Sequence, residues 1–343
     1  MAQGPGTMTD TAIPTLPVTP PIPGLHFRPY RGEEDLPVLV ELLRAADEAN
    51  GEEMVASIDR LRAHYRNMTR VDPTQDVILG FVDDRLVAHS LIEWADTAYG
   101  ERHFNSLGSV HPDWRRRGIG AAMMARNETR LLEIASAQDF DETAVLTTWM
   151  QDLDIGARAL AGERGYHHAR VYHHMVRPTL DDIFIPPLPE GLEVRPIGRE
   201  LLPAYWNAMC EAFRDHFGAW DDSESAFRSW TDSPLFELDL QIVAFDGDEI
   251  AGGIHAAVDP TENREHGYLR GWSEPIFTLR PWRRRGLAAA LLGRTLTALR
   301  DWDMTSAQLH VDADNSHQAF TLYERHGFAV ASSSSEWHKP LGV

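Results

Sequence analysis

The pattern of apolar and polar positions predicts the same succession of strands and helices twice along the chain. Alternating apolar and polar residues predict a strand, and apolar residues that recur every three to four positions predict a helix. In the first round the predicted strands lie at 25–31, 76–94 (a hairpin turning at Asp83 and Asp84), 104–110, 144–149 and 169–176. The predicted helices lie within 34–50, within 57–68, after residue 118 and within 154–165.

The second round repeats this order. Its first strand, "LEVRPIG" at 192–198, matches "LHFRPYR" at 25–31, and each contains an Arg-Pro pair. The remaining strands are predicted at 241–258 (a hairpin turning at Asp246 and Gly247), 275–279, 307–313 and 328–334, and the helices within 201–218, 287–302 and 316–327. The same elements in the same order indicate an internal duplication with a mixed α/β (α+β) fold.

Proline-rich segments divide the chain. Residues 1–24 are rich in Pro, Thr and Gly and predict a disordered leader. Residues 177–193 combine prolines with acidic residues, which places a linker at 179–190. The predicted units are an N-terminal half at 25–178 and a C-terminal half at 191–343, and 343 residues suit two such domains.

Composition excludes several classes of protein. A net charge of −20 disfavours nucleic acid as a partner and suits a cationic or zwitterionic ligand. No run of about 18 apolar residues is present to span a membrane, and the leader has no apolar core of a secretory signal, so a cytoplasmic protein is expected. The single cysteine, Cys210, excludes a disulfide framework, and its apolar neighbours at helical spacing indicate a core residue.

An arginine-glycine motif occurs once in each half. Residues 112–124 read "PDWRRRGIGAAMM" and residues 281–292 read "PWRRRGLAAALL". Each lies between a predicted strand and a predicted helix, where the first helical N–H groups and the helix dipole bind anions. Glycines at 118 and 286 permit close approach of a diphosphate, and arginines add charge. The motif is neither a P-loop nor a dinucleotide-binding fingerprint, yet it predicts a phosphate-bearing ligand.

These residues resemble a known family. The spacing of Arg283, Gly286 and Ala288, repeated as Arg115, Gly118 and Gly120, resembles motif A of the GCN5-related N-acetyltransferases (GNAT). A second signature of the family resembles "VDADNSHQAFTLYERHGF" at 311–328. Two such domains in one chain resemble the mycothiol synthases and their tandem relatives.

The resemblance implies two tandem GNAT folds, each a twisted, mixed, mostly antiparallel sheet with flanking helices and splayed central strands. It implies acetyl-CoA as cosubstrate, held between the splayed strands with its pyrophosphate on the turn, and an acceptor amine that attacks the thioester directly. The positions it assigns to the cofactor are Val110, Arg115, Arg117, Gly118, Ile119 and Gly120 in the first half, and Leu279, Arg283, Arg284, Arg285, Gly286, Leu287, Ala288 and Asn315 in the second.

The resemblance also implies catalytic residues in the C-terminal half. Tyr323 matches the family's general acid, which protonates the leaving thiolate, and Glu274 stands where a base carboxylate is often found. His310 on the next strand is a second candidate for the base. Pro275 removes a ladder donor and suits a bulge or a sheet edge. Asn315 either contacts the cofactor or caps the next helix.

The N-terminal half keeps the turn but lacks these groups. Aligning "LAGERGY" at 160–166 with "LYERHGF" at 322–328 places Ala161 opposite Tyr323. No acid stands opposite Glu274, and nothing matches Asn315. The first half is therefore predicted to be non-catalytic, with CoA binding there left open.

The sequence thus predicts an acetyl-CoA-dependent N-acetyltransferase whose C-terminal half acetylates the primary amine of a small molecule. The open alternatives are a non-catalytic acyl-CoA-binding regulatory or scaffold protein, a transferase for longer acyl groups, and a mycothiol synthase proper. The acceptor is expected near the loop 213–227, which carries Asp215, His216, Trp220, Asp221 and Asp222. Two histidine pairs, at 167–168 and 173–174, lack a clear third ligand, so no metal is expected. The expected partners exclude nucleic acid and membranes, and the chain is expected to be a monomer or homodimer.

Overall fold

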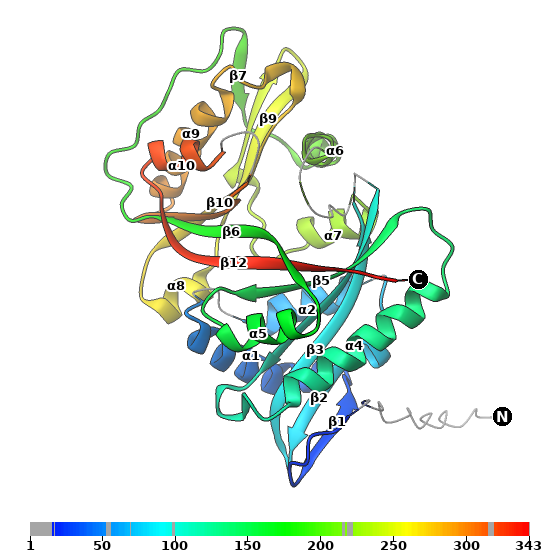
Figure 1. The fold of residues 1–343 in the computed structure, drawn as a ribbon. Coiled ribbons are helices and arrows are strands. Elements are labelled where there is room, and N and C mark those ends of the chain that lie inside the picture. The colour runs from blue at the N-terminus through cyan, green and yellow to red at the C-terminus, as the bar shows by residue number, and fades with distance from the viewer. Residues whose placement is uncertain are drawn as a thin grey trace, which may run out of the picture.

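The computed structural model describes residues 16, 18–52, 56–68, 70–97, 100–214, 217, 222–314 and 319–342. Within these ranges the chain forms a mixed α/β fold built on one sheet (Figure 1). Its strands are β1 (Leu25–Pro29), β2 (Val77–Val82), β3 (Arg85–Asp96), β4 (Glu101–Val110), β5 (Thr143–Gln151), β6 (His167–Arg177), β7 (Leu192–Arg195), β8 (Gln241–Asp246), β9 (Glu249–Val258), β10 (Arg270–Thr278), β11 (Ser306–Asp312) and β12 (Ala329–Pro340). Its helices are α1 (Leu36–Asn50), α2 (Ile58–Asn67), α3 (Pro73–Asp76), α4 (Ile119–Ser136), α5 (Ile155–Glu163), α6 (Leu202–Phe213), α7 (Glu224–Thr231), α8 (Pro260–His266), α9 (Leu287–Asp301) and α10 (Ala319–Arg325).

The two rounds of elements predicted from sequence are both present, and each contains a pair of parallel strands that diverge. Strand β4 pairs with β5 over 101–105, and β10 pairs with β11 over 270–272; beyond these residues the partners separate. The remaining strand pairs of the sheet are antiparallel. The mixed, mostly antiparallel sheet with splayed central strands is therefore confirmed.

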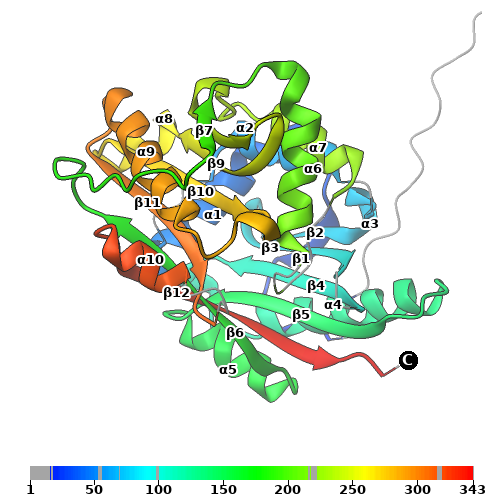
Figure 2. The same cartoon turned by 90° about the horizontal axis from the view of Figure 1, so that it is seen from above.

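The last strands of the two halves are exchanged, which the sequence does not predict. The strand order is β1-β2-β3-β4-β5-β12-β6-β11-β10-β9-β8-β7, so β12 lies beside β5 and β6 lies beside β11. The two exchanged strands also pair with each other across the centre of the molecule (Figures 1 and 2). A boundary between β6 and β7 divides the two rounds along the chain, but the sheet is continuous across it.

Buried apolar side chains form several clusters between the sheet and the helices that cover it. In the C-terminal half α9 packs its apolar face, including Leu291, Leu292 and Leu296, against the strands. Cys210 of α6 is buried among apolar side chains, as the sequence predicts. None of the helices in the described ranges is both long and apolar enough to cross a membrane.

The end of the leader packs onto the N-terminal half. Leu16 is only 8% exposed and joins a core cluster with Ile119, Ala122 and Met123 of α4. Pro20 is also buried. The packed part of the chain therefore begins before the predicted boundary at residue 25.

Arg177 fastens the exchanged strand β6 to the C-terminal half. Its guanidinium donates hydrogen bonds to the backbone carbonyls of Thr179, Asp182 and His326, and the residue is 6% exposed.

Replacing Arg177 by Met retains the aliphatic stem but leaves these carbonyls without their donor, at a cost of about 1–3 kcal/mol for a buried unsatisfied group. We expect the free energy of unfolding, measured in urea, to fall by about 3 kcal/mol. A change below about 0.5 kcal/mol would show that Arg177 does not hold the exchange.

Candidate active site

Two turns of the same conformation begin α4 and α9. Gly118 and Gly286 have φ of 86° and 87°, and Arg116 and Arg284 both have φ of 60°. Side chains with a Cβ rarely adopt this left-handed region, which explains the glycines. Neither helix start has a side-chain cap, so its first N–H groups can bind an anion. The two copies of the arginine-glycine motif thus fold alike.

A cavity of about 1670 Å³ adjoins the second turn. Its walls come from the diverging strands β10 and β11, from α9 and α10, and from the exchanged strand β6. The sequence-predicted residues on these walls are Glu274, Arg283, Arg284, Gly286, Leu287, Ala288 and Tyr323, and His310 joins them. Leu279 and Arg285 are not part of the wall, and Asn315 lies outside the described residues, as do Asp215, His216, Trp220 and Asp221 of the predicted acceptor loop.

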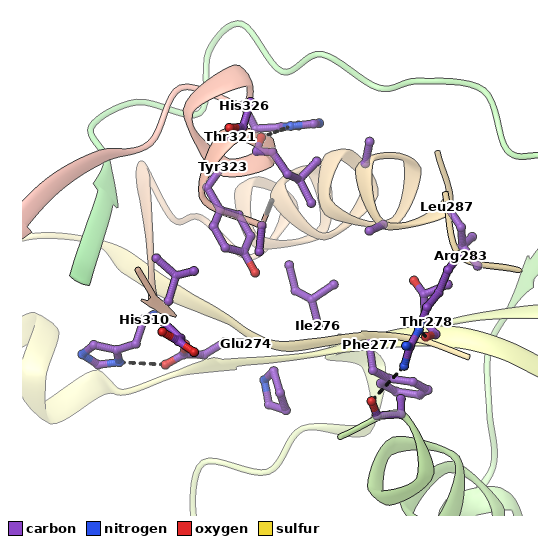
Figure 3. A pocket seen from close by; sticks show the side chains of 18 of the residues that line it. Glu274, Ile276, Phe277, Thr278, Arg283, Leu287, His310, Thr321, Tyr323 and His326 are labelled. Atoms are coloured by element: carbon purple, nitrogen blue, oxygen red, sulfur yellow. Dashed lines mark hydrogen bonds and ion pairs between the residues drawn. The ribbon is translucent and has the colours of Figure 1, made fainter. Parts of the chain in front are cut away.

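The two rival candidates for the base form one hydrogen-bonded pair. Oε1 of Glu274 lies 2.9 Å from Nδ1 of His310, and Oε2 accepts the backbone N–H of His310 at 2.5 Å (Figure 3). Glu274 and Pro275 lie in an irregularity of the pairing of β10 with β9, between Ser273 and Ile276. The bulge predicted from Pro275 is therefore present.

Opposing effects set the protonation of His310. Burial lowers its pKa, but the hydrogen bond and charge of Glu274, with the more distant charges of Glu52 and Glu262, raise the pKa above its ordinary value. The imidazole stacks on Trp272 with ring centroids 5.1 Å apart, and His174 of β6 lies 5.2 Å away. The ring is thus held between a carboxylate and two neighbouring rings.

Tyr323 approaches the same cavity from the opposite side. Its side chain extends from α10 towards β10, with the hydroxyl directed into the cavity (Figure 3). The residue is 7% exposed, and burial together with the charge of Glu274 raises the pKa of its hydroxyl. The phenol therefore stays protonated at neutral pH, so a proton donor is present in the cavity.

The first arginine of each motif turns its side chain into the protein. Nε of Arg283 donates to the carbonyl of Thr278 at 2.9 Å, and a terminal nitrogen donates to Ala212 at the end of α6. Arg115 makes the equivalent bond to Val110 at 3.1 Å and reaches Asn50 of α1. These guanidiniums link the end of the strand to an earlier helix by hydrogen bonds, and in this way they stabilise the conformation of the turn.

The equivalent bonds align the two halves residue by residue. Strand β4 pairs regularly with β3, whereas β10 carries one extra residue in the bulge between Ser273 and Ile276, so Ser106 aligns with Ser273 and Leu107 stands opposite the Glu274–Pro275 bulge. Parallel pairing of His103 with Val145, and of Arg270 with Ser306, then places Trp149 opposite His310. Ala161, aligned with Tyr323, is fully buried in the core. The N-terminal half therefore carries none of the three ionisable groups that face the C-terminal cavity.

The surroundings of the first turn also differ from those of the second. A Cβ added to Gly118 would lie 3.5 Å from Pro20 of the leader, whereas no atom of the described residues would lie within 4 Å of one added to Gly286. The side chain of Arg116 approaches Gly156 at the start of α5, and Arg117 lies over the ring of Trp114. Ile119 is buried in the core and Gly120 lies close to Leu160. The leader and α5 thus crowd a turn that is open in the other half.

Strand exchange supplies wall residues that the sequence analysis does not identify. Arg170 and Tyr172 of β6 line the cavity of the C-terminal half. Nothing in the local sequence of β6 indicates this, because it depends on which half the strand joins. The two members of the second histidine pair have separate partners, since His173 contacts Ser333 and His174 contacts Gln308.

Comparison with known proteins agrees with this geometry. The family model described as the acetyltransferase (GNAT) family matches residues 206–328. A mycothiol acetyltransferase of Salinispora arenicola (strain CNS-205) is 30% identical over 321 residues, which cover 88% of this chain and 92% of the relative. A mycothiol acetyltransferase of Geodermatophilus obscurus is 28% identical over 312 residues, which cover 88% of this chain and 93% of that one.

Solved structures show the same fold. A GCN5-related N-acetyltransferase from Sphaerobacter thermophilus superposes with a TM-score of 0.73 at 24% identity, covering 96% of this chain and 98% of that one. A tandem GNAT protein from the clavulanic acid biosynthesis pathway superposes with a TM-score of 0.67 at 17% identity, covering 93% and 99%. The chain belongs to the acetyltransferase (GNAT) family, with the tandem architecture that its duplicated sequence predicts, and it is an acyltransferase.

Proposed function

We propose that this enzyme transfers an acetyl group from acetyl-CoA to the primary amine of a small molecule, and that only the C-terminal half is active. One observation carries the proposal: Tyr323 and the paired Glu274 and His310 face a single cavity beside the open turn at Gly286. At the equivalent positions the N-terminal half has Ala161, Leu107 and Trp149.

The turn and the start of α9 are the part of the chain suited to hold the cosubstrate. Leu287, Ala288 and Ala289 line the cavity where the helix offers its uncapped N–H groups, and Arg284 adds a positive charge. The gap between β10 and β11 beyond residue 272 leaves room for an extended pantetheine arm. The family uses acetyl-CoA, and these residues suit its diphosphate.

His310 is the proposed general base, and Glu274 positions it. When Nδ1 carries the proton and donates to Glu274, the lone pair of Nε2 can accept the proton that the acceptor ammonium must lose. The freed amine attacks the thioester carbonyl carbon, a C–N bond forms and the C–S bond breaks. Tyr323 donates its proton to the leaving sulfur, and the second proton released by the attacking nitrogen returns to the Tyr323 phenolate through solvent, so the products are a neutral amide and a neutral thiol.

The pH profile tests this assignment, because kcat/KM falls when the base is protonated. Since the pKa of His310 lies above its ordinary value, activity should decline as the pH drops to neutral and below. Replacing Glu274 by Gln removes the charge that raises the pKa of His310, so the acid limb should move to lower pH while kcat falls. Glu249→Gln, a change at an exposed carboxylate on β9, is the control. An unshifted acid limb in Glu274→Gln would exclude His310 as the titrating base.

Mycothiol acetyl transfer is the more specific candidate, favoured by relatives that align over nearly the whole chain. Release of CoA from acetyl-CoA across a panel of small amines, including the amine precursor of mycothiol, tests both levels. Release with that precursor alone supports the specific activity, and release with other amines supports the general one. A panel without turnover, despite tight binding of acetyl-CoA, would favour a non-catalytic binding protein.

A further inference from the structure

A second cluster of ionisable side chains lies where the exchanged strand β12 enters the N-terminal half. Glu101 and His103 come from β4, and Glu336 and His338 come from β12. Strand β5 lies between these two strands, and alternate residues of a strand share a face, so the four side chains meet on one side of the sheet. Because β12 is the last strand of the chain, only the exchange brings these residues together.

The geometry of the cluster is that of a ligand set. Nε2 of His103 lies 2.9 Å from Oε2 of Glu101, and one ligand atom each from Glu101, His103 and His338 lie within 4.8 Å of one another. Zinc–ligand bonds of about 2.0–2.2 Å place the ligand atoms of a tetrahedral site about 3.4 Å apart. Closing the set around one ion therefore needs the ligand atoms to approach one another by about 1 Å, which rotation about side-chain torsions can provide.

Glu336 completes the arrangement, since it is hydrogen-bonded to one imidazole and lies near the other. It is buried, and its Oε1 lies 2.8 Å from Nε2 of His338 and 3.7 Å from Nδ1 of His103. In metal sites a carboxylate commonly accepts the N–H of a ligating imidazole, which leaves the other ring nitrogen for the ion. The Tyr172 hydroxyl also donates to Glu336, so this carboxylate is fixed from two sides.

We propose that Glu101, His103 and His338 bind a divalent transition-metal ion, with Glu336 orienting His338. Two imidazoles and a carboxylate suit Zn²⁺, Co²⁺ or Mn²⁺, and a water would complete a tetrahedron. The side chains of Glu101 and His338 are 32% and 18% exposed, so the ion can reach the site from solvent. These histidines differ from the adjacent pairs considered in the sequence. The inference goes beyond acetyl transfer and does not depend on it.

The ion would join the end of the chain to the first half. It links β4 to β12 across β5, and it acts on the folded chain alone, because the unfolded chain does not hold the four residues together. Binding to the folded state only raises the melting temperature as the metal concentration increases. The expected role is to stabilise the exchanged strand and, through Glu336 and Tyr172, one wall of the acyl-transfer cavity.

The test uses the full-length chain without a histidine tag, stripped with EDTA and titrated with CoCl₂ or ZnCl₂. We expect one ion per chain by calorimetry, a visible Co²⁺ spectrum of tetrahedral type, and a rise in melting temperature. Glu101→Gln and His338→Gln should weaken binding by about tenfold or more. His266→Gln, a change at an exposed histidine of α8, should bind as the wild type does.

Two results would overturn the proposal. One is the finding that the wild-type chain, once stripped of metal, binds no ion, in which case hydrogen bonds alone hold the cluster together. The other is unchanged affinity in variants that circular dichroism shows to be folded. Should either variant fail to fold, X-ray absorption of the zinc-loaded wild type decides, since the site requires two imidazole ligands and fewer would contradict it.

Discussion

Replacing Tyr323 by Phe should lower kcat by about 10²–10⁴-fold and leave the affinity for acetyl-CoA within about twofold. The change removes one hydroxyl and retains the ring, which packs edge-on against Phe328 at 6.1 Å. The lost group is the proposed proton donor to the departing sulfur, so the penalty falls on the transition state and not on ground-state binding. Release of CoA measured with a saturating amine gives kcat, and calorimetry with CoA gives the dissociation constant.

Tyr205→Phe is the matched control for this prediction. Tyr205 is also a buried tyrosine of the C-terminal half, its hydroxyl has no hydrogen-bond partner among the residues that the structure describes, and it does not line the cavity. Its variant should keep kcat within about twofold, because a hydroxyl without a partner contributes little to stability or geometry. Equal rates for Tyr323→Phe and the wild type would remove Tyr323 from the mechanism. A parallel loss in both variants would indicate damage to the fold.

Local sequence patterns predict those parts of the site that are formed by residues close together in the chain. The turns at Gly118 and Gly286 follow from strand-to-helix motifs that need only neighbouring residues. The pairing of Glu274 with His310 depends on the register of β10 and β11, in which Trp272 lies beside Gln308, and on the bulge at Pro275. Periodicity does not specify that register, so the sequence indicates the two residues only as separate candidates for the base.

Strand exchange lies beyond such patterns. Strands β6 and β12 stand at equivalent places in the two rounds, and either could pair with β5 or with β11. Alternation of apolar and polar residues specifies which face of a strand is buried but not which sheet it joins. The positions of Tyr172, His174 and the cluster around His103 depend on that choice, so none of them can be derived from periodicity.

Substituting the turn glycines tests which half holds the cosubstrate. Gly286→Val places a β-branched residue at a φ of 87°, which displaces the turn and the N–H groups that it aims at the diphosphate. Losing two or more charge-assisted hydrogen bonds costs about 3 kcal/mol, so affinity for CoA should fall by roughly 100-fold. The wild-type chain should bind one CoA per chain in calorimetry.

Gly118→Val is the matched control because its φ of 86° imposes the same backbone strain in the other half. Both variants should lose a similar free energy of unfolding, about 2 kcal/mol. Only Gly286→Val should lose CoA, because Pro20 lies against the first turn and Arg116 spans from it to α5. Two CoA molecules per chain in the wild type, or a comparable loss of affinity in Gly118→Val, would instead make the N-terminal half a second binding site. The arginine-glycine motif would then bind CoA in both halves, with the proposed catalytic residues present in only one of them.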